Sequence, residues 1–238
     1  MAGAAIWVVI PAAGSGKRMG VETPKQYLDL AGRSVIEHTL ERFTRHAAVA
    51  GVVVSLAEHD AHWPRLEVAY AEKIVTSLGG AERVHSVLNG LAVVADRAPA
   101  STWILVHDAV RPCLRAVDLD RLLAEAARDP VGGILAVPVR DTMKRAGSDR
   151  RISATISRAD LWHAQTPQMF RLAALRGALQ AALADNVIVT DEAQAMERVG
   201  SMPLIVEGHP DNIKITRRED LALAERILRS QGDACACA

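Results

Sequence analysis

Short apolar runs alternate with amphipathic segments through the first half of the chain. Four apolar runs have the length of a buried strand: 6–10, 51–57, 102–109 and 132–139. Three segments between them repeat apolar residues at helical spacing: 34–43, 81–96 and 117–129. Strands of near-continuous apolar residues separated by amphipathic helices are typical of an α/β fold. We therefore predict a mostly parallel sheet with helices on both faces, which binds its ligands beyond the carboxyl ends of the strands.

The second half of the chain continues with weaker signals. The pattern predicts a loop over 161–170 and short strands over 203–208 and 212–216. The predicted helices are 171–183, 189–200 and 216–228. Ser34 with Glu37 and Thr216 with Glu219 form candidate capping boxes, and Thr190 or Asp191 is the expected cap of the helix at 189–200. We expect one domain over 1–232 and a disordered tail over 233–238, which holds Cys235 and Cys237.

The segment 139–160 differs from the body around it. Its two strand-like stretches meet at the turn signal Gly147-Ser148-Asp149, and most of its residues are polar or charged. A hairpin with so little apolar surface is marginal alone. It is either a solvated flap or a protruding arm that pairs with something else. Because exposed strand edges invite pairing with a second copy, we expect a homodimer with an exchanged arm.

The overall composition excludes several classes of partner. The 28 basic residues balance the 28 acidic ones, so no general field attracts nucleic acid or an anionic membrane. The apolar start is too short to span a bilayer and no Lys or Arg precedes it, unlike a signal peptide. The three cysteines make no disulfide framework. We expect a cytoplasmic protein with no nucleic-acid and no membrane partner.

The loop after the first strand is the main candidate for anion binding. Gly14 and Gly16 let backbone amides turn inward, and Arg18 and Lys25 add positive charge. A Walker A loop is excluded because Arg18 stands where that loop needs Ser or Thr, and the dinucleotide fingerprint is excluded because its third glycine is one place late. The alternative to a polyphosphate cradle is a glycine turn with solvated lysines.

Three later stretches carry further candidate chemistry. Asp108 follows a buried strand and could hold a divalent cation or accept a hydroxyl, while Arg111 could bind a phosphate. The alternative is an Asp–Arg ion pair that only fixes the loop. Arg83 follows a glycine pair at a helix start, where it either reads a base or phosphate or lies exposed. Lys214 faces away from its neighbouring isoleucines, toward a site or into water.

Taken in order, these stretches resemble one enzyme family. The motifs are "PAAGSGKRM", "PKQY", "GGAER", "HDAVRP", "PVRDTMKR", "WHAQTPQ", "TDEA" and "DNIKIT". Together they resemble the 2-C-methyl-D-erythritol 4-phosphate cytidylyltransferases of non-mevalonate isoprenoid biosynthesis, from the first strand to the last helix. The resemblance implies a Rossmann-like sheet, an arm exchanged in a dimer, and reaction of CTP with a sugar-alcohol phosphate in the presence of Mg²⁺.

The resemblance also implies a role for each candidate residue. Arg18, Lys25, Arg158 and Lys214 would be catalytic, with Arg158 and Thr142 supplied by the partner's arm. Ala12, Ala13, Gly14, Gly16, Gly80, Arg83 and Ser86 would surround the nucleotide. Asp108, Arg111, Thr142 and Thr190 would bind the acceptor, and Asp108 the metal. Ala81 stands where the family often has Asp, so a nucleoside contact through that carboxylate is absent.

Two rival functions fit parts of the same pattern. A cytidylyltransferase for another polyol phosphate, such as ribitol 5-phosphate, would share the glycine loop and the "HDAVRP" region. A non-catalytic nucleotide-binding protein on the same fold would be expected to lack at least one of Arg18, Lys25 and Lys214, and all three are present. The motifs after Pro138 favour the methylerythritol substrate.

Overall fold

A seven-stranded sheet forms the centre of the protein, which we describe from a computed structural model covering residues 5–14 and 23–236, with side chains to 232. Its strands are β1 (Ile6–Pro11), β4 (Val49–Leu56), β5 (Ile74–Leu78), β6 (Trp103–Val106), β7 (Gly132–Pro138), β10 (Trp162–Arg171) and β11 (Leu204–Glu207). They lie in the order β11-β7-β10-β6-β1-β4-β5, and β10 alone runs antiparallel to its neighbours. The predicted α/β class is confirmed.

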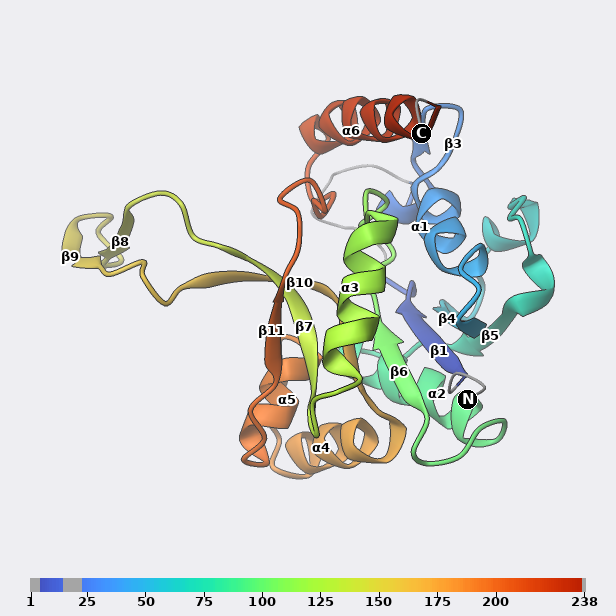
Figure 1. Cartoon of the computed structure of the whole chain (residues 1–238), viewed down its shortest axis with the longest axis horizontal. Helices are drawn as coiled ribbons and strands as arrows, with labels where there is room; N and C mark the ends of the chain where they lie inside the picture. Colours follow the sequence, from blue (N-terminus) through green and yellow to red (C-terminus); the bar gives the residue numbers. More distant parts are fainter. Residues whose placement is uncertain (1–4, 15–22, 237–238) are drawn as a thin grey trace.

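Helices cover both faces of the sheet, as the apolar patterns predict (Figure 1). They are α1 (Val35–Thr44), α2 (Arg83–Ala95), α3 (Ala116–Ala126), α4 (Leu172–Ala184), α5 (Glu192–Arg198) and α6 (Glu219–Ala236). One apolar cluster joins α1 and α3 to one face, and a second joins α2, α4 and α5 to the other. A third, smaller cluster holds α6 near the start of α1. Within the residues that the structure describes, no helix has the length and hydropathy needed to cross a bilayer.

Helix caps follow the sequence at two starts and depart from it at a third. Ser34 and Glu37 form the expected capping box of α1, with Glu37 accepting from both the backbone and the hydroxyl of Ser34 at 2.7 Å. Asp191, one of the two expected residues, caps α5 by accepting from the amide of Gln194. At α6 the side chain that accepts from Thr216 is that of Asp220, at 2.8 Å, and the predicted box with Glu219 is wrong.

Two predicted elements of the second half are wrong. Residues 161–170 form most of strand β10 rather than a loop, because polar side chains in a central strand hide its alternation. The pairing of β10 with β7 shifts between Ala164 and Gln168, which re-aims the side chains there. Residues 212–216 form no strand. Ile215 is buried, and its amide donates a single hydrogen bond to the carbonyl of Val110 instead of pairing with a neighbouring strand.

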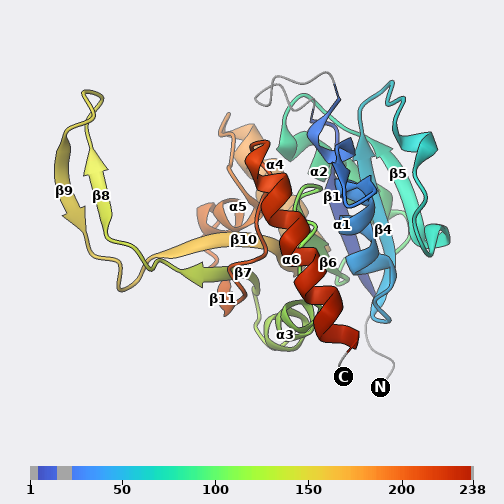
Figure 2. The ribbon, with the colours of Figure 1, turned by 90° about the horizontal axis from the view of Figure 1, so that it is seen from above.

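The hairpin predicted within 139–160 is present. Strands β8 (Met143–Ala146) and β9 (Ile152–Ile156) pair antiparallel as a separate two-stranded sheet. They project from the body at the end of β7 and β10 (Figure 2). Nearly all of the hairpin's side chains are exposed, including Ile152 at 66 %. Its exchange between two copies stays a prediction. At the other end of the chain, α6 continues to Ala236, into the segment expected to be a tail, and residues 237–238 with Cys237 lie outside the described part.

Candidate active site

Two cavities meet at the carboxyl ends of the parallel strands. The β1–β5 cavity, of about 370 Å³, is lined by Pro11, Ala13, Gly14, Lys25, Gly80, Ala81, Glu82, Arg83, Ser86, Asp108, Ala109, Val110 and Lys214. The β10 cavity, of about 200 Å³, is lined by Arg83, Asp108, Arg111, Ala164, Gln165, Thr166, Gln168, Thr190, Asp191 and Lys214. Three charged side chains therefore line both cavities: Arg83, Asp108 and Lys214.

Asp108 is the electrostatic centre of this shared wall. Its Oδ2 lies 2.9 Å from Nζ of Lys214 and 3.3 Å from Nε of Arg111, and its Oδ1 lies 3.4 Å from Nε of Arg83. Burial alone would raise the pKa of this carboxyl, but Arg83, Lys214 and Arg111 together hold it well below its ordinary value. One buried anion thus gathers three cations. The Asp–Arg ion pair left open by the sequence exists as part of this larger group.

Arg83 is held on its other side by a buried carboxylate. It begins α2, and its Nη1 and Nη2 bind Oε1 and Oε2 of Glu192 at 2.6 and 3.1 Å. Glu192 begins α5 and is 1 % exposed, so the pair also joins the two helices. Burial opposes the charge of Arg83, yet Glu192 and Asp108 raise its guanidinium pKa above the ordinary value. The guanidinium is therefore fixed in position before any ligand arrives.

A hydrogen-bonded chain fixes the loop after β6. The amide of Asp108 donates to Oγ1 of Thr166 at 3.1 Å, and this oxygen lies 3.0 Å from Nδ1 of His107. The other ring nitrogen of His107 lies 3.1 Å from the carbonyl of Arg111, so Nε2 donates and Nδ1 accepts. Burial lowers the pKa of His107 to about 4, which keeps the ring neutral at pH 7. No role was predicted for this histidine from the sequence, and in the structure its two ring nitrogens support the loop.

The loop after β1 is closed by a residue that the sequence analysis did not nominate. Gln26 is buried in the 3₁₀ turn η2 (Lys25–Tyr27), and its Nε2 donates to the carbonyls of Ala12 at 2.7 Å and Gly14 at 3.2 Å. The two ends of the loop are thereby tied together, and Lys25 lines the same cavity as Gly14. Arg18 and Gly16 lie outside the described residues.

Glycines let the loop after β5 lie against the loop after β1. A Cβ on Gly79 would clash with the side chain of Ala13, and one on Gly80 would clash with that of His85. Ser86 then bonds the turn, because its hydroxyl accepts from the amide of Gly80 at 3.0 Å. The result is a smooth backbone wall on one side of the β1–β5 cavity, which suits a flat ligand group.

Most of the predicted site residues that the structure describes meet at these two cavities, and three of them do not. Ala12 belongs to the core, and only its carbonyl reaches the loop. Thr142 and Arg158 lie on the projecting arm, both exposed, and neither lines a cavity described above. Arg158 donates instead to the carbonyl of Arg140 within the same arm. Of the acceptor group, Asp108, Arg111 and Thr190 line the β10 cavity as expected.

The polar wall of the β10 cavity was missed by the sequence analysis. Gln165 and Gln168 are 6 % and 1 % exposed, and Nε2 of Gln168 donates to Asp191 at 3.0 Å. Asn212 is fully buried, and its side-chain amide donates to the carbonyl of Thr166. No role was predicted for it from the sequence either. The available signal was the cluster of amides and a hydroxyl in "WHAQTPQ", which was assigned to a loop. The amide of Gln168 is engaged by Asp191 and by the backbone of Ala193, so it fixes the wall of the cavity and the position of Asp191.

The site suits an electrostatic reaction on anions. Lys25, Lys214 and Arg83 line one cavity, and Arg111 adds a fourth cation on the side of the other. Among the described residues, no cluster of three His, Cys, Asp or Glu side chains could hold a metal alone. A divalent cation would need phosphate oxygens beside Asp108, whose Oδ1 faces only one of the three cations.

Comparisons with known proteins agree on one family. The sequence model of IspD, 2-C-methyl-D-erythritol 4-phosphate cytidylyltransferase, matches residues 6–230. A protein of Pseudomonas putida (strain GB-1) with that name is 56 % identical over 218 residues, which are 91 % of this chain and 93 % of the relative. A protein of Pseudomonas aeruginosa (strain PAO1) with the same name is 56 % identical over 223 residues, covering 93 % and 95 %.

Solved structures give the same result for the fold. A crystal structure of a 4-diphosphocytidyl-2C-methyl-D-erythritol synthase matches with a TM-score of 0.82 at 38 % identity, covering 94 % of this chain and 99 % of the other. The 2-C-methyl-D-erythritol 4-phosphate cytidylyltransferase of Francisella tularensis matches with a TM-score of 0.82 at 34 % identity and the same coverage. The Rossmann-like architecture expected from the resemblance is confirmed.

Proposed function

The chain belongs to the 2-C-methyl-D-erythritol 4-phosphate cytidylyltransferase family, and on this basis we propose that it joins CTP and 2-C-methyl-D-erythritol 4-phosphate. The products are 4-diphosphocytidyl-2-C-methyl-D-erythritol and pyrophosphate. The observation that carries the proposal is the shared wall of Arg83, Asp108 and Lys214 between a larger and a smaller cavity. Two anionic ligands in those cavities would meet with their phosphates at this wall.

The proposed step is an in-line displacement. An oxygen of the methylerythritol phosphate attacks the α-phosphorus of CTP and forms the new P–O bond. The bond from the α-phosphorus to the bridging oxygen breaks, and pyrophosphate leaves with the electron pair. The attacking monoester has a second pKa near ~6, so it is largely a dianion at neutral pH and needs no general base. Catalysis then rests on positioning and on neutralising charge.

The described cations divide this work by position. Lys25 lies on the side of the β1–β5 cavity, where we place the triphosphate, and Arg18 joins it in the proposal. Lys214 lies at the boundary, where attack would occur, and Arg111 lies on the acceptor side. Asp108 limits the repulsion among these cations and fixes their orientation before binding, so little reorganisation is needed during reaction.

Mg²⁺ belongs to the same proposal. Asp108 would hold it through one oxygen, and phosphate oxygens and water would complete its shell, which matches the preference of Mg²⁺ for few carboxylates. When bound, the ion adds charge neutralisation at the phosphates. The cytoplasmic location expected from the sequence and the single catalytic domain over 1–232 stay part of this proposal.

The arm is proposed to complete the site of a second copy in a homodimer. Thr142 and Arg158 are exposed and lie away from the cavities of their own chain. Met143 and Ile152 are also exposed, at 37 % and 66 %, on a hairpin too small to be stable alone. Burial against a partner would cover this apolar surface and carry Arg158 to the other chain's phosphates.

Pyrophosphate release tests the proposed function. The purified protein is incubated with Mg²⁺, methylerythritol phosphate and each nucleoside triphosphate in turn, and we expect release with CTP in large excess over the others. Ribitol 5-phosphate replaces the acceptor in a parallel reaction. Faster turnover with ribitol 5-phosphate would favour the rival cytidylyltransferase, and binding of CTP without release under any acceptor would favour the non-catalytic reading.

A further inference from the structure

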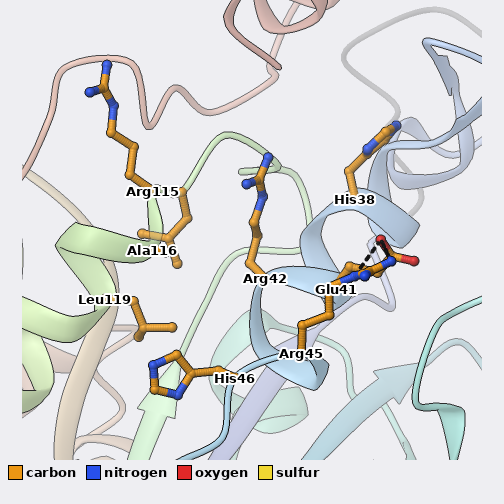
Figure 3. A pocket seen from close by; sticks show the side chains of 9 residues that line it. His38, Glu41, Arg42, Arg45, His46, Arg115, Ala116 and Leu119 are labelled. Atoms are coloured by element: carbon orange, nitrogen blue, oxygen red, sulfur yellow. Dashed lines mark hydrogen bonds and ion pairs between the residues drawn. The ribbon is translucent and has the colours of Figure 1, made fainter. Parts of the chain in front are cut away.

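A third cavity lies between α1 and the start of α3, apart from the two cavities of the candidate active site. This α1–α3 cavity has a volume of about 350 Å³, within the range of small-molecule sites. Its lining residues are His38, Glu41, Arg42, Arg45, His46, Leu114, Arg115, Ala116 and Leu119 (Figure 3). None of them lines either cavity of the active site. The proposed reaction leaves this cavity without a role.

The charge in the α1–α3 cavity is not balanced by its own acid. Glu41 is its one carboxylate, and it binds Arg45 at 3.2 Å while also binding Arg33 at 2.8 Å. Arg42 forms no ion pair with any described residue. Its Nε donates to the carbonyl of Pro112 at 2.9 Å. The two Nη groups of Arg42 are therefore available for an acceptor that carries negative charge.

Arg42 occupies the middle of the lining side chains, between Arg115 and His38 (Figure 3). Burial lowers its guanidinium pKa, so the charge is partly removed from water and would gain from a counter-ion. Arg115 is paired to Asp211, with its Nε 2.7 Å from Oδ2. A planar guanidinium binds phosphate oxygens in a bidentate manner, which makes Arg42 the natural centre of an anion site.

Two leucines form the apolar part of the wall, beside the histidines and arginines that also line it. Leu114 and Leu119 are each 1 % exposed, and they pack in the main core rather than moving freely at the surface. A ligand that combines one phosphate with a small apolar body would satisfy Arg42 and these leucines together. Inorganic phosphate would satisfy only the arginine.

We propose that the α1–α3 cavity is a second ligand site, which binds the phosphate group of a small organic phosphate through Arg42. The apolar body of the ligand lies against Leu114 and Leu119. Because Arg42 also holds the carbonyl of Pro112, the bound phosphate lies beside the chain segment that carries Arg111.

Phenyl phosphate is the probe, and its binding is followed by residue-resolved NMR of the full chain. We expect saturable shifts at the His38 ring and at the amides of Ala116 and Leu119, and none with benzyl alcohol, which lacks the charge. Arg42→Gln removes a charge-assisted contact, so it is expected to weaken binding roughly tenfold or more. Arg176→Gln, an exposed arginine on α4 across the sheet, serves as the matched control and is expected to bind as the wild type does.

Shifts confined to residues of the β1–β5 and β10 cavities would overturn the proposal, as would equal binding by Arg42→Gln and wild type. If Arg42→Gln lowers the melting temperature, Arg42→Lys is used instead, because lysine keeps the positive charge but lacks the two Nη groups that bind phosphate as a pair. The same loss of affinity is then required of it. Neither result depends on turnover, so the proposal fails or stands separately from the proposed reaction.

Discussion

The buried pair of Arg83 and Glu192 has separable roles in stability and in activity. Replacing Arg83 by Met removes two charged hydrogen bonds, of 2.6 and 3.1 Å, and leaves the carboxylate of Glu192 at 1 % exposure without its partner. Breaking a buried pair by removing one member costs about 3–5 kcal/mol. We expect Arg83→Met to lower the free energy of unfolding by that order, measured by urea titration monitored by circular dichroism.

A second variant separates the two roles. Replacing both members by apolar residues, as Arg83→Met with Glu192→Leu, removes the stranded charge together with its partner. Such replacements are often neutral, so the double variant is expected to recover most of the loss, apart from the contact of Arg83 with Oδ1 of Asp108 at 3.4 Å that it still lacks. Activity is not expected to recover with it, because Arg83 lines both cavities. A double variant as unstable as Arg83→Met alone, or one with wild-type turnover, would refute the reasoning.

Three other predictions follow from the site. Lys25→Ala is expected to lower kcat roughly 10²-fold with an unchanged melting temperature, the scale for losing one charge stabiliser; near-normal turnover would remove Lys25 from the mechanism. Mixed Arg158→Ala and Lys25→Ala proteins are expected to regain activity after subunit exchange, and demonstrated heterodimers without activity would contradict a shared site. In metal-free protein, His107 binds a proton only near pH 4 when folded but near pH 6.5 when unfolded. The free energy of unfolding therefore decreases as the pH is lowered from 6.5 to 4. The loss at pH 5 is about 2 kcal/mol; His107→Gln is expected to abolish this part of the urea-unfolding pH profile, and the exposed His59→Gln to keep it.

Apolar patterning was sufficient for most strands in the parallel part of the sheet, but it did not identify the edge strand β5 (Ile74–Leu78). The run at 6–10 is a buried strand because both of its faces are covered by helices, which removes the polar alternation from its sequence. Ser34 and Glu37 could likewise be read directly, since a capping box depends on neighbours in sequence.

Strand β10 could not be read in the same way. Gln165, Thr166 and Gln168 are buried polar residues whose hydrogen bonds run to Asp108, His209 and Asp191, all distant in sequence. A local sequence pattern predicts a loop for such residues. Their hydrogen-bond partners, which make burial possible, come close only in the folded chain. Lys214 shows the converse case: its predicted strand is absent, yet its side chain reaches Asp108 through the loop.

The site residues were predictable to the extent that motifs name them. The meeting of Arg83, Asp108 and Lys214 at one wall required three-dimensional information, since they come from α2, from the loop after β6 and from the segment after β11. The roles of Gln26 and His107 depend on bonds to backbone carbonyls, which a sequence does not reveal. The motifs thus identify the cations of the site, but they do not identify the residues that hold the loops in position.

The central claim is that the phosphates of two ligands meet at the wall of Arg83, Asp108 and Lys214. A crystal structure of the protein with CTP tests it most directly. The account predicts the cytosine beside the turn at Gly80 and Ser86, with the α-phosphorus within contact distance of the Lys214 amine. A nucleotide bound with its α-phosphate away from Lys214, facing bulk solvent or seated in another cavity, would contradict it.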